Sequence, residues 1–452
     1  MLIKIAASKD RLKFATWRLL NSMFSPMCGL DQRITFILPG RRDPQFITSG
    51  CHPTGMYLLQ DPDAKTAPNP LDYHIGGSGY LLDEALIRAL GETAERYTQI
   101  ISEAAGTCEI KFCNIAELPL YEADSMDPAW LQFLEPAQLE HESCLFEPYK
   151  KSSPLGWVQA NSLTGERDCW LPAQLVLVGY RVRIKSGEPR IWSAVTTGTA
   201  VHSDHMSAVK GALLELIQID SAMGHWYTRS TAPRIKESDR NKTIISLAHK
   251  LLRGTASQAR FHWLANADLP GFHVACVITG ERRNRLACVG LGAAMTLSEA
   301  MYKSLLEGIA VIQLAKVITL YEDGSEGAVS TGEHLSDLNR NVLLYATNED
   351  AASQVELLFP EDECIDNDDL PCDFKGTDKE AVQEIILGFK KAGMDLYHLN
   401  LTTPDIGGLG LVSHRVWSPH VLGLCLPSWP QKMHPRFSAY GDVVNNYPHP
   451  YP

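Results

Sequence analysis

Residues 76–96, GGSGYLLDEALIRALGETAER, place a glycine-rich segment directly before an amphipathic stretch that ends in acids and a base. The unit recurs twice, with Gly198 before the segment 208–215 and the glycines of 290–292 before the segment 300–307. Each copy reads Ala, three residues, Ala or Ser, Leu, one small or apolar residue, then Glu. A repeated turn-plus-helix unit with a glutamate at a fixed helical position predicts that the three acids meet in the fold; they are Glu92, Glu215 and Glu307.

Residues three and four positions apart share one face of a helix, which shows what accompanies each glutamate. Glu95 and Arg96 follow Glu92 on its face, and Gln218 follows Glu215. Carboxylates beside an amide and a guanidinium suit Mg²⁺, which binds through one or two carboxylates plus substrate phosphates. The chain contains no GxxxxGK[ST] motif, so such a phosphate site is not a P-loop. A solvated helix face is the alternative interpretation.

Composition excludes several classes of function. The net charge is −12 and no long run of Lys or Arg occurs, which argues against nucleic acid as the main partner. The 11 cysteines are scattered without a CxxC pair, which is typical of a reducing, cytoplasmic compartment. Charges from Lys4 to Lys13 interrupt any signal-peptide core, and no apolar run approaches the ~18 residues of a membrane span. We expect a soluble protein that binds no membrane.

Strand-like and helix-like segments alternate along the chain, which predicts an α/β protein of repeated strand, glycine-turn and helix units, with helices packed on mixed sheets. Helices are expected at 81–104, 205–226, 244–251, 297–316 and 381–392. Strands are expected at 33–38, 156–162, 175–184, 260–264, 273–279 and 395–401. Irregular chain is expected at 119–154 and 325–337, and a solvated acidic connection at 361–369.

The chain stops on residues 445–452, NNYPHPYP, in which proline occupies every second position at the end. Each proline ring fixes φ near −65° and disfavours helix before it, so the segment should be stiff and extended. A terminal carboxylate on a rigid segment can be aimed at a site and act there as a base. A frayed end is the alternative.

With these units and this terminus, the chain resembles the YcaO-domain proteins, and among them the SagD-like, azoline-forming cyclodehydratases of ribosomal peptide natural products. The resemblance covers nearly the whole chain. The sequence marks that carry it are Phe24-Ser25-Pro26 with Gly29, Glu92 to Arg96, Trp157 with Ser162-Leu163, Trp170-Leu171-Pro172, Glu215 to Asp220, Thr402 to Asp405 and the closing Asn445 to Pro452. It implies an N-terminal segment at 1–60, a YcaO catalytic domain at 61–440 and a proline-rich tail at 441–452.

The resemblance implies an ATP-dependent enzyme of the bacterial cytoplasm. A Cys, Ser or Thr of a precursor peptide would attack the preceding amide, whose oxygen takes the γ-phosphoryl group of ATP, and loss of phosphate would leave a thiazoline or oxazoline. Glutamates of the repeats would ligate Mg²⁺: Glu92, Glu95, Glu215 and Glu307. Polar side chains would contact ATP: Ser25, Arg96, Gln218 and Arg285. The Pro452 carboxylate would serve as the base.

Two departures from the family pattern stand out. Arg88 occupies the place of a usual serine, and Gln218-Ile219 replaces a usual Glu-Arg pair. The family also implies partners: a separate E1-like, leader-binding protein, the precursor peptide, a second copy in a homodimer, and as a further candidate an FMN-dependent azoline dehydrogenase. Two alternative functions remain, a thioamide-forming YcaO enzyme and a non-catalytic nucleotide-binding scaffold. The scaffold is favoured only by Ala310, which stands where a second acid of the third repeat would be.

Overall fold

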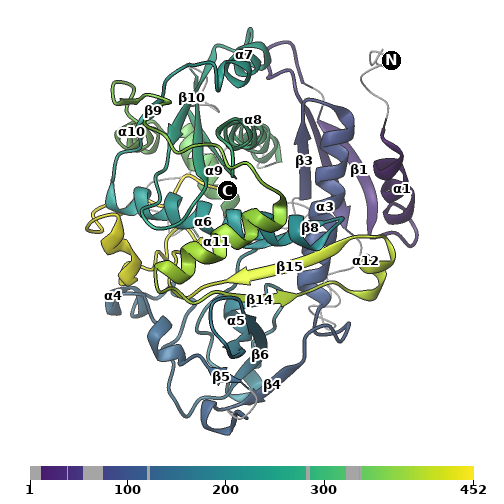
Figure 1. Cartoon of the computed structure of the whole chain (residues 1–452), viewed down its shortest axis with the longest axis vertical. Helices are drawn as coiled ribbons and strands as arrows, with labels where there is room; N and C mark the ends of the chain where they lie inside the picture. The colour runs from purple at the N-terminus through teal and green to yellow at the C-terminus, as the bar shows by residue number, and fades with distance from the viewer. Residues whose placement is uncertain are drawn as a thin grey trace.

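The structure is a computed structural model that describes residues 12–37, 39–53, 75–119, 123–280, 286–321, 335 and 338–452. Across these ranges helices pack on three sheets (Figure 1). The predicted α/β class with helices on mixed sheets is confirmed. In the same ranges, no helix has the length and apolar character that a membrane crossing requires.

The first sheet is antiparallel in the order β1-β2-β3 and carries the first repeat. Its strands are β1 (Asp31–Ile37), β2 (Ile47–Pro53) and β3 (Ile75–Gly79). Helix α3 (Leu82–Ile101) packs directly on β3 because glycine gives it room. A Cβ at Gly77 would lie 2.0 Å from the backbone oxygen of Ala85 and 2.3 Å from the nitrogen of Ala89. The small residues of the repeat therefore let helix and strand backbones touch.

The second sheet has the order β12-β11-β10-β9-β13. Its strands are β9 (Arg234–Ile235), β10 (Ser257–Trp263), β11 (Phe272–Gly280), β12 (Ala287–Ala294) and β13 (Cys364–Ile365). Helix α8 (Leu297–Tyr321) covers one face, and helix α6 (His205–Thr228) contacts β11 and β12. Alternate residues of β11 belong to different cores, with Val274 and Cys276 in the core that α8 shares, and Ala275 and Val277 in the core that holds Trp226 of α6. The sheet is therefore buried on both faces.

The third repeat uses the same close packing as the first. A Cβ at Gly290 would lie 1.9 Å from the backbone nitrogen of Gly308, and one at Gly292 would lie 2.2 Å from the oxygen of Ala300. Both glycines lie in β12 and face α8. The prediction of a glycine turn before each helix is thus wrong for the first and third copies, where the glycines belong to strands. It holds for Gly198, which has φ of +82° directly before β8.

The third sheet has the order β5-β7-β6-β14-β15-β8, with β4 also paired to β6. Its strands are β4 (Ile110–Cys113), β5 (Asp124–Ser125), β6 (Leu155–Ser162), β7 (Cys169–Pro172), β8 (Thr199–His202), β14 (Tyr397–Asn400) and β15 (Val412–Trp417). Strands β14 and β15 cross the middle of the molecule, below the five-stranded sheet and above β4 to β6 (Figure 1). Helices α3 and α6 both contact β8 and β15. The first two repeats therefore meet over this pair of strands.

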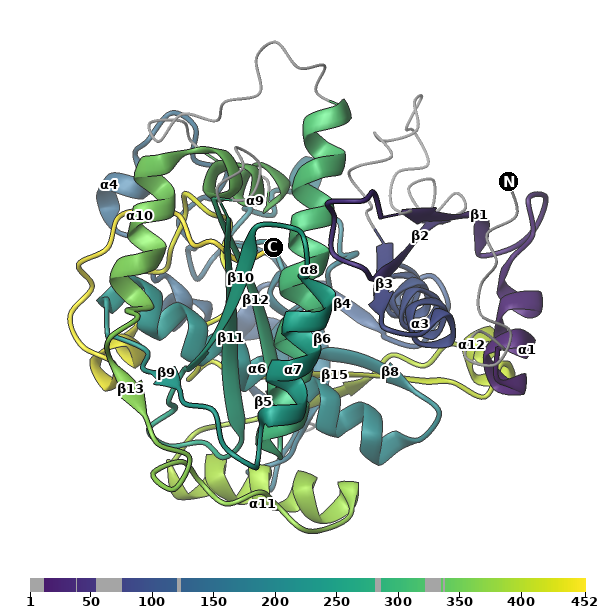
Figure 2. The ribbon, with the colours of Figure 1, turned by 90° about the horizontal axis from the view of Figure 1, so that it is seen from above.

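The remaining helices surround these layers, and Figure 2 shows α7 and α8 in front of the five-stranded sheet. They are α1 (Phe14–Met23), α4 (Pro136–Leu139), α5 (Ala173–Val176), α7 (Lys242–Leu251), α9 (Leu338–Thr347), α10 (Glu349–Leu358), α11 (Asp378–Lys391) and α12 (Pro404–Gly408). Short 3-10 turns occur at η1 (Ile115–Glu117), η2 (Pro128–Leu131), η3 (Ile184–Ser186) and η4 (Pro435–Ala439).

Most predicted elements are present with ends shifted by a few residues. The strand expected at 175–184 is wrong. The start of this segment belongs to α5, whose four residues are all buried, and its end belongs to η3. The run of apolar residues therefore reflects burial of a short helix, and not the alternation of a strand. The loop expected at 325–337 lies almost wholly outside the described residues. The division into segments 1–60, 61–440 and 441–452 stays a prediction.

The C-terminal segment packs into the molecule. Trp226 donates to the backbone oxygen of Tyr447 at 3.0 Å, and Asn341 of α9 donates to the backbone oxygen of His449. His449 and Tyr451 are buried, at 0% and 1% exposure. The frayed alternative is therefore wrong, and the end of the chain is held in a defined place beside α6 and α9, near the centre of Figure 1.

Candidate active site

The three repeated glutamates hold the same position relative to their glycine segments. Glu92 accepts a hydrogen bond from the backbone nitrogen of Gly76 at 3.1 Å, and Glu307 accepts one from that of Leu291 at 3.2 Å. Glu215 accepts one from the backbone N–H of Gly198. The repeat therefore fixes each carboxylate over the segment that precedes its helix.

The carboxylates also influence one another. Burial raises the pKa of Glu307 to about 8, and the charges of Glu215 and Glu92 add to that rise. Burial raises the pKa of Glu215 to about 7, although Arg96 and Arg415 oppose the shift. The pKa of Glu95 lies well above its usual value, because of burial and the charge of Glu215. The structure thus brings together all four glutamates that the sequence singled out, and leaves them short of positive charge.

Two arginines partly offset this negative charge. Arg96 pairs with Glu92 at 3.2 Å, as the i, i+4 spacing on α3 requires. Arg415 of β15 is 2% exposed, and burial lowers its pKa to about 10, although the charges of Glu215 and Glu95 oppose that shift. Arg415 was missed by sequence reasoning because the strand 412–417 was not predicted. The segment 412–417, VSHRVW, has no regular apolar alternation that could have revealed it.

These residues fit magnesium bound with a nucleotide. Burial first, and neighbouring negative charge second, raise the pKa values of Glu95, Glu215 and Glu307, and a bound divalent cation favours their ionised forms. Among the described residues, no three His, Cys, Asp or Glu side chains converge on one point as the ligands of a single ion do. Mg²⁺ bound to phosphates takes only one or two protein carboxylates per ion, so the arrangement suits that mode of binding.

Ser25 lies in the turn before β1. Among the described residues, it forms no hydrogen bond with the four glutamates. Its hydroxyl accepts from the backbone nitrogens of Met27 and Cys28, both at 3.3 Å. The turn is tied to α3 through Asp31, because Ser25 donates its N–H to the Asp31 backbone oxygen at 3.0 Å and Thr93 donates to the Asp31 carboxylate at 3.0 Å. Thr93 directly follows Glu92. The turn is therefore anchored beside the acids, and its role toward ATP stays a prediction.

Of the two other side chains that we predicted to contact the nucleotide, the structure describes one. Gln218 is partly exposed on α6, one turn beyond Glu215 and on its face. Arg285 lies outside the described residues. Arg88, which replaces the family's serine, pairs with Glu84 at 3.1 Å. Glu84 also accepts from Tyr302 of α8 at 2.7 Å, so Arg88 belongs to the contact between α3 and α8.

Asp220 has a structural role within the family-like segment 215–220. It is 0% exposed and accepts hydrogen bonds from both Nε and Nη2 of Arg436, the latter at 2.8 Å. Tyr440 donates to the same carboxylate at 2.8 Å. Asp220 thus fixes the segment that leads into the C-terminal tail.

The segment Thr402–Asp405 also has a structural role. Tyr97 donates to the Asp405 carboxylate at 2.6 Å, and Tyr97 directly follows Arg96. The segment therefore ties α12 to the end of the acidic stretch of α3.

Pro452 ends the tail beside α6, the helix that carries Glu215 and Gln218. Trp226, which binds the tail, lies eight residues beyond Gln218, about 12 Å along a helix axis. The tail is held by main-chain contacts to Tyr227 as well, since the nitrogens of Val444 and Asn445 both donate to the Tyr227 oxygen at 2.9 Å. The tail as far as Tyr451 is therefore held beside α6, where the ring centroids of Tyr451 and Trp226 lie 6.4 Å apart. Its action as a base stays a prediction.

Comparison with known proteins identifies the class. The family model described as YcaO cyclodehydratase, ATP- and Mg²⁺-binding, matches residues 76–422. The chain therefore belongs to the YcaO family, as the sequence predicted. The family description confirms ATP and Mg²⁺ as the cofactors expected for this chain.

Solved structures agree on the fold. A heterocyclase in complex with substrate and cofactor matches with a TM-score of 0.75 at 18% identity, over 97% of this chain and 57% of that one. A YcaO protein from Methanopyrus kandleri bound with AMPPCP and Mg²⁺ matches at 0.60 and 18%, over 87% and 86%. A chain of the E. coli microcin synthetase McbBCD complex matches at 0.63 and 14%, over 95% and 98%.

The chain spans about half to three-fifths of the length of two of these relatives, the heterocyclase in complex with substrate and cofactor and the heterocyclase TruD. No curated protein sequence matches it significantly.

Proposed function

We propose that this protein is an ATP-dependent peptide cyclodehydratase. The observation that carries the proposal is the meeting of Glu92, Glu95, Glu215 and Glu307 with Arg96, in a family whose members bind ATP and Mg²⁺. Phosphoryl transfer depends mainly on positioning and on neutralising charge, and this cluster has the groups for both.

The proposed reaction balances through one molecule of ATP for each ring. The side chain of a Cys, Ser or Thr in a precursor peptide attacks the preceding amide carbon, and the carbonyl oxygen takes the γ-phosphoryl group. Loss of that oxygen as phosphate leaves a thiazoline or oxazoline, with ADP as the other product. Bound Mg²⁺ supplies the positive charge that offsets the phosphate oxygens.

The chain's own residues have separate parts in this scheme. Glu92, Glu95, Glu215 and Glu307 hold Mg²⁺, while Arg96 and Gln218 contact the phosphates. Ser25 and Arg285 complete the nucleotide site. The Pro452 carboxylate, which follows the part of the tail held beside α6, accepts a proton from the attacking side chain or the amide nitrogen.

Partners follow from the same proposal. A separate leader-binding protein delivers the precursor peptide, an FMN-dependent dehydrogenase oxidises azolines to azoles, and two copies of the chain form a homodimer. Other solved structures provide the precedent for a peptide-bound assembly, since one neighbour is the McbBCD complex with pro-MccB17 bound. We propose the cytoplasm as the site of action.

The test is phosphate release from ATP alongside the mass of a Cys-containing peptide, with candidate partner protein present. Loss of one water per ring, with one phosphate per water, supports cyclodehydration. Replacement of oxygen by sulfur at unchanged backbone length indicates the thioamide-forming alternative. Tight binding of Mg²⁺ and AMPPCP without any mass change indicates the scaffold alternative and contradicts the proposal.

A further inference from the structure

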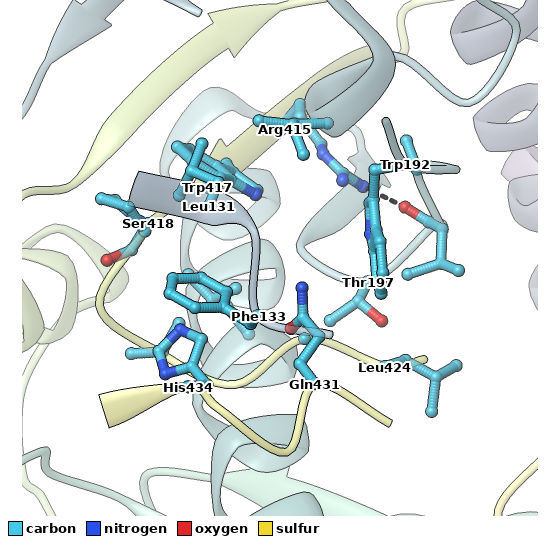
Figure 3. Close-up of a pocket in the computed structure, with 17 residues that line it drawn as sticks. Leu131, Phe133, Trp192, Thr197, Arg415, Trp417, Ser418, Leu424, Gln431 and His434 are labelled. Atoms are coloured by element: carbon cyan, nitrogen blue, oxygen red, sulfur yellow. Dashed lines mark hydrogen bonds between the residues drawn. The ribbon is translucent and has the colours of Figure 1, made fainter. Parts of the chain in front are cut away.

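An aromatic hollow, drawn in Figure 3, has Arg415 among the residues that line it. The space within it that the centre of a water molecule can occupy is about 50 Å³. Trp192, Phe133, His434 and Trp417 surround it, and Arg415 lies at its upper edge in the view. Its walls come from distant segments: the chain after η2, the chain before β8, β15, and the loops that follow β15.

The hollow and the acid cluster share residues. Arg415 lines the hollow and also interacts electrostatically with Glu215 and Glu95. Leu216 lines it too, and it is the residue that follows Glu215 on α6. A molecule seated in the hollow therefore lies next to the carboxylates that we assign to Mg²⁺ and ATP.

Arg415, which lines the hollow, carries a buried donor without a partner among the described residues. Its Nη1 donates to the Val195 backbone oxygen at 2.8 Å and to Thr199 at 3.0 Å. Its Nε is buried and has no hydrogen-bond partner among the described residues. A buried donor without a partner costs free energy, which a ligand acceptor at this place removes. The hollow therefore combines flat apolar walls with one cationic donor.

The hollow also adjoins the C-terminal tail. Trp192 and Val195, like Tyr447, pack against the core cluster that contains Tyr451. Leu424 of the hollow precedes Cys425, whose backbone oxygen is 2.9 Å from His449 Nε2. The hollow therefore adjoins the acid cluster through Arg415 and the tail through Leu424 and Cys425.

We propose that the hollow is a specificity pocket for the precursor peptide, an inference that rests on the proposed function. It receives a flat, uncharged side chain from the residue that follows the reacting Cys, Ser or Thr, whose own carbonyl is not the one that is phosphorylated. The backbone carbonyl of that residue accepts the Nε–H of Arg415. The pocket thereby places the neighbouring amide against the acid cluster and discriminates among peptides by the residue next to the reacting Cys, Ser or Thr.

Gly423 gives a clean way to fill the pocket. It lines the hollow, and a Cβ added to it would meet no atom within 4 Å. Gly423→Leu should therefore occupy the pocket without a backbone clash. Gly408→Leu is the matched control, because Gly408 is exposed on α12 and its Cβ position is also open.

The probe is N-acetyl-5-fluorotryptophan methylamide, followed by fluorine NMR on the full chain, with the alanine analogue as a competitor that lacks the ring. Wild type and Gly408→Leu should bind the probe, and Gly423→Leu should weaken binding at least about tenfold. Trp192→Ala and Arg415→Lys should each weaken it too, one by removing a wall and the other by removing the Nε donor. Binding that is absent from wild type, or equal in Gly423→Leu, overturns the inference.

A separate calorimetric titration with Mg²⁺ and AMPPCP tests whether the hollow binds a peptide side chain or the nucleotide. We expect unchanged nucleotide affinity in Gly423→Leu and no displacement of the probe by the nucleotide. Displacement would assign the hollow to adenine and overturn the peptide pocket while leaving the proposed function intact. Probe binding in a protein that never releases phosphate with peptide would instead contradict the proposed function and leave the pocket in place.

Discussion

Replacing Glu307 by glutamine tests the electrostatic state of the acid cluster. Glutamine keeps the shape of the side chain and an oxygen that accepts from the Leu291 N–H. The unfolded glutamate titrates near 4.5, and burial raises the folded pKa to about 8. Between these values the folded protein binds more protons than the unfolded chain, so stability falls as pH rises toward 8.

The size of the effect follows from the shift. One pH unit corresponds to about 1.4 kcal/mol while the folded group stays protonated and the unfolded group is ionised. From about pH 6 to the folded pKa near 8, the wild type should lose roughly 3 kcal/mol that Glu307→Gln does not lose. Above that pKa the difference should remain constant.

Urea unfolding of the nucleotide-free protein across about pH 6 to about pH 9 measures this difference. Glu384→Gln is the control, because Glu384 is exposed on α11. Adding Mg²⁺ with AMPPCP should stabilise the wild type more at the alkaline end, since ionised carboxylates bind the cation, and should stabilise Glu307→Gln less. Parallel stability curves for wild type and Glu307→Gln would refute the argument that this carboxyl is held protonated by its surroundings.

Three further predictions concern packing and the tail. Gly290→Ala should cost about 3 kcal/mol or more in urea unfolding, because its Cβ would lie 1.9 Å from the Gly308 nitrogen, whereas Gly408→Ala should be nearly neutral. Asp220→Asn should cost about 3 kcal/mol by leaving the buried Arg436 guanidinium short of its partner; an unchanged unfolding midpoint would contradict that assignment. Adding one glycine after Pro452 should lower turnover at least about 100-fold while Mg²⁺–AMPPCP affinity stays constant, and full activity would exclude the terminal carboxylate as a base.

The sequence predicted the acid cluster because the repeat encodes it. Glu92, Glu215 and Glu307 occupy equivalent positions in three copies of one unit, and equivalent backbone N–H groups hold them. The glycines were interpreted as turns because glycine usually marks a change of direction. Here two of the segments are strands, and glycine serves close packing against Ala85, Ala89 and Ala300. The need for glycine at these strand positions depends on the helix that packs against them. A short stretch of sequence around each glycine does not show that helix.

The residues that sequence reasoning missed depend on tertiary contact. Arg415 lies between the cluster and the hollow because β15 pairs with β8 directly before α6, a pairing between segments more than 200 residues apart. The hollow itself draws Phe133, Trp192 and His434 from separate loops. Periodicity cannot predict such a meeting. The tail was predicted to be stiff, but its binding to Trp226 and Asn341 needed the structure.

The most direct test of the central claim follows the oxygen of the amide. A Cys-containing peptide labelled with ¹⁸O at the carbonyl before the cysteine is incubated with the protein, Mg²⁺, ATP and the candidate partner protein, and the released phosphate is analysed by mass spectrometry. The account predicts that each ring formed transfers its labelled oxygen to one phosphate, and that Glu215→Gln suppresses ring and labelled phosphate together. Rings formed with unlabelled phosphate would contradict activation of the amide by phosphorylation.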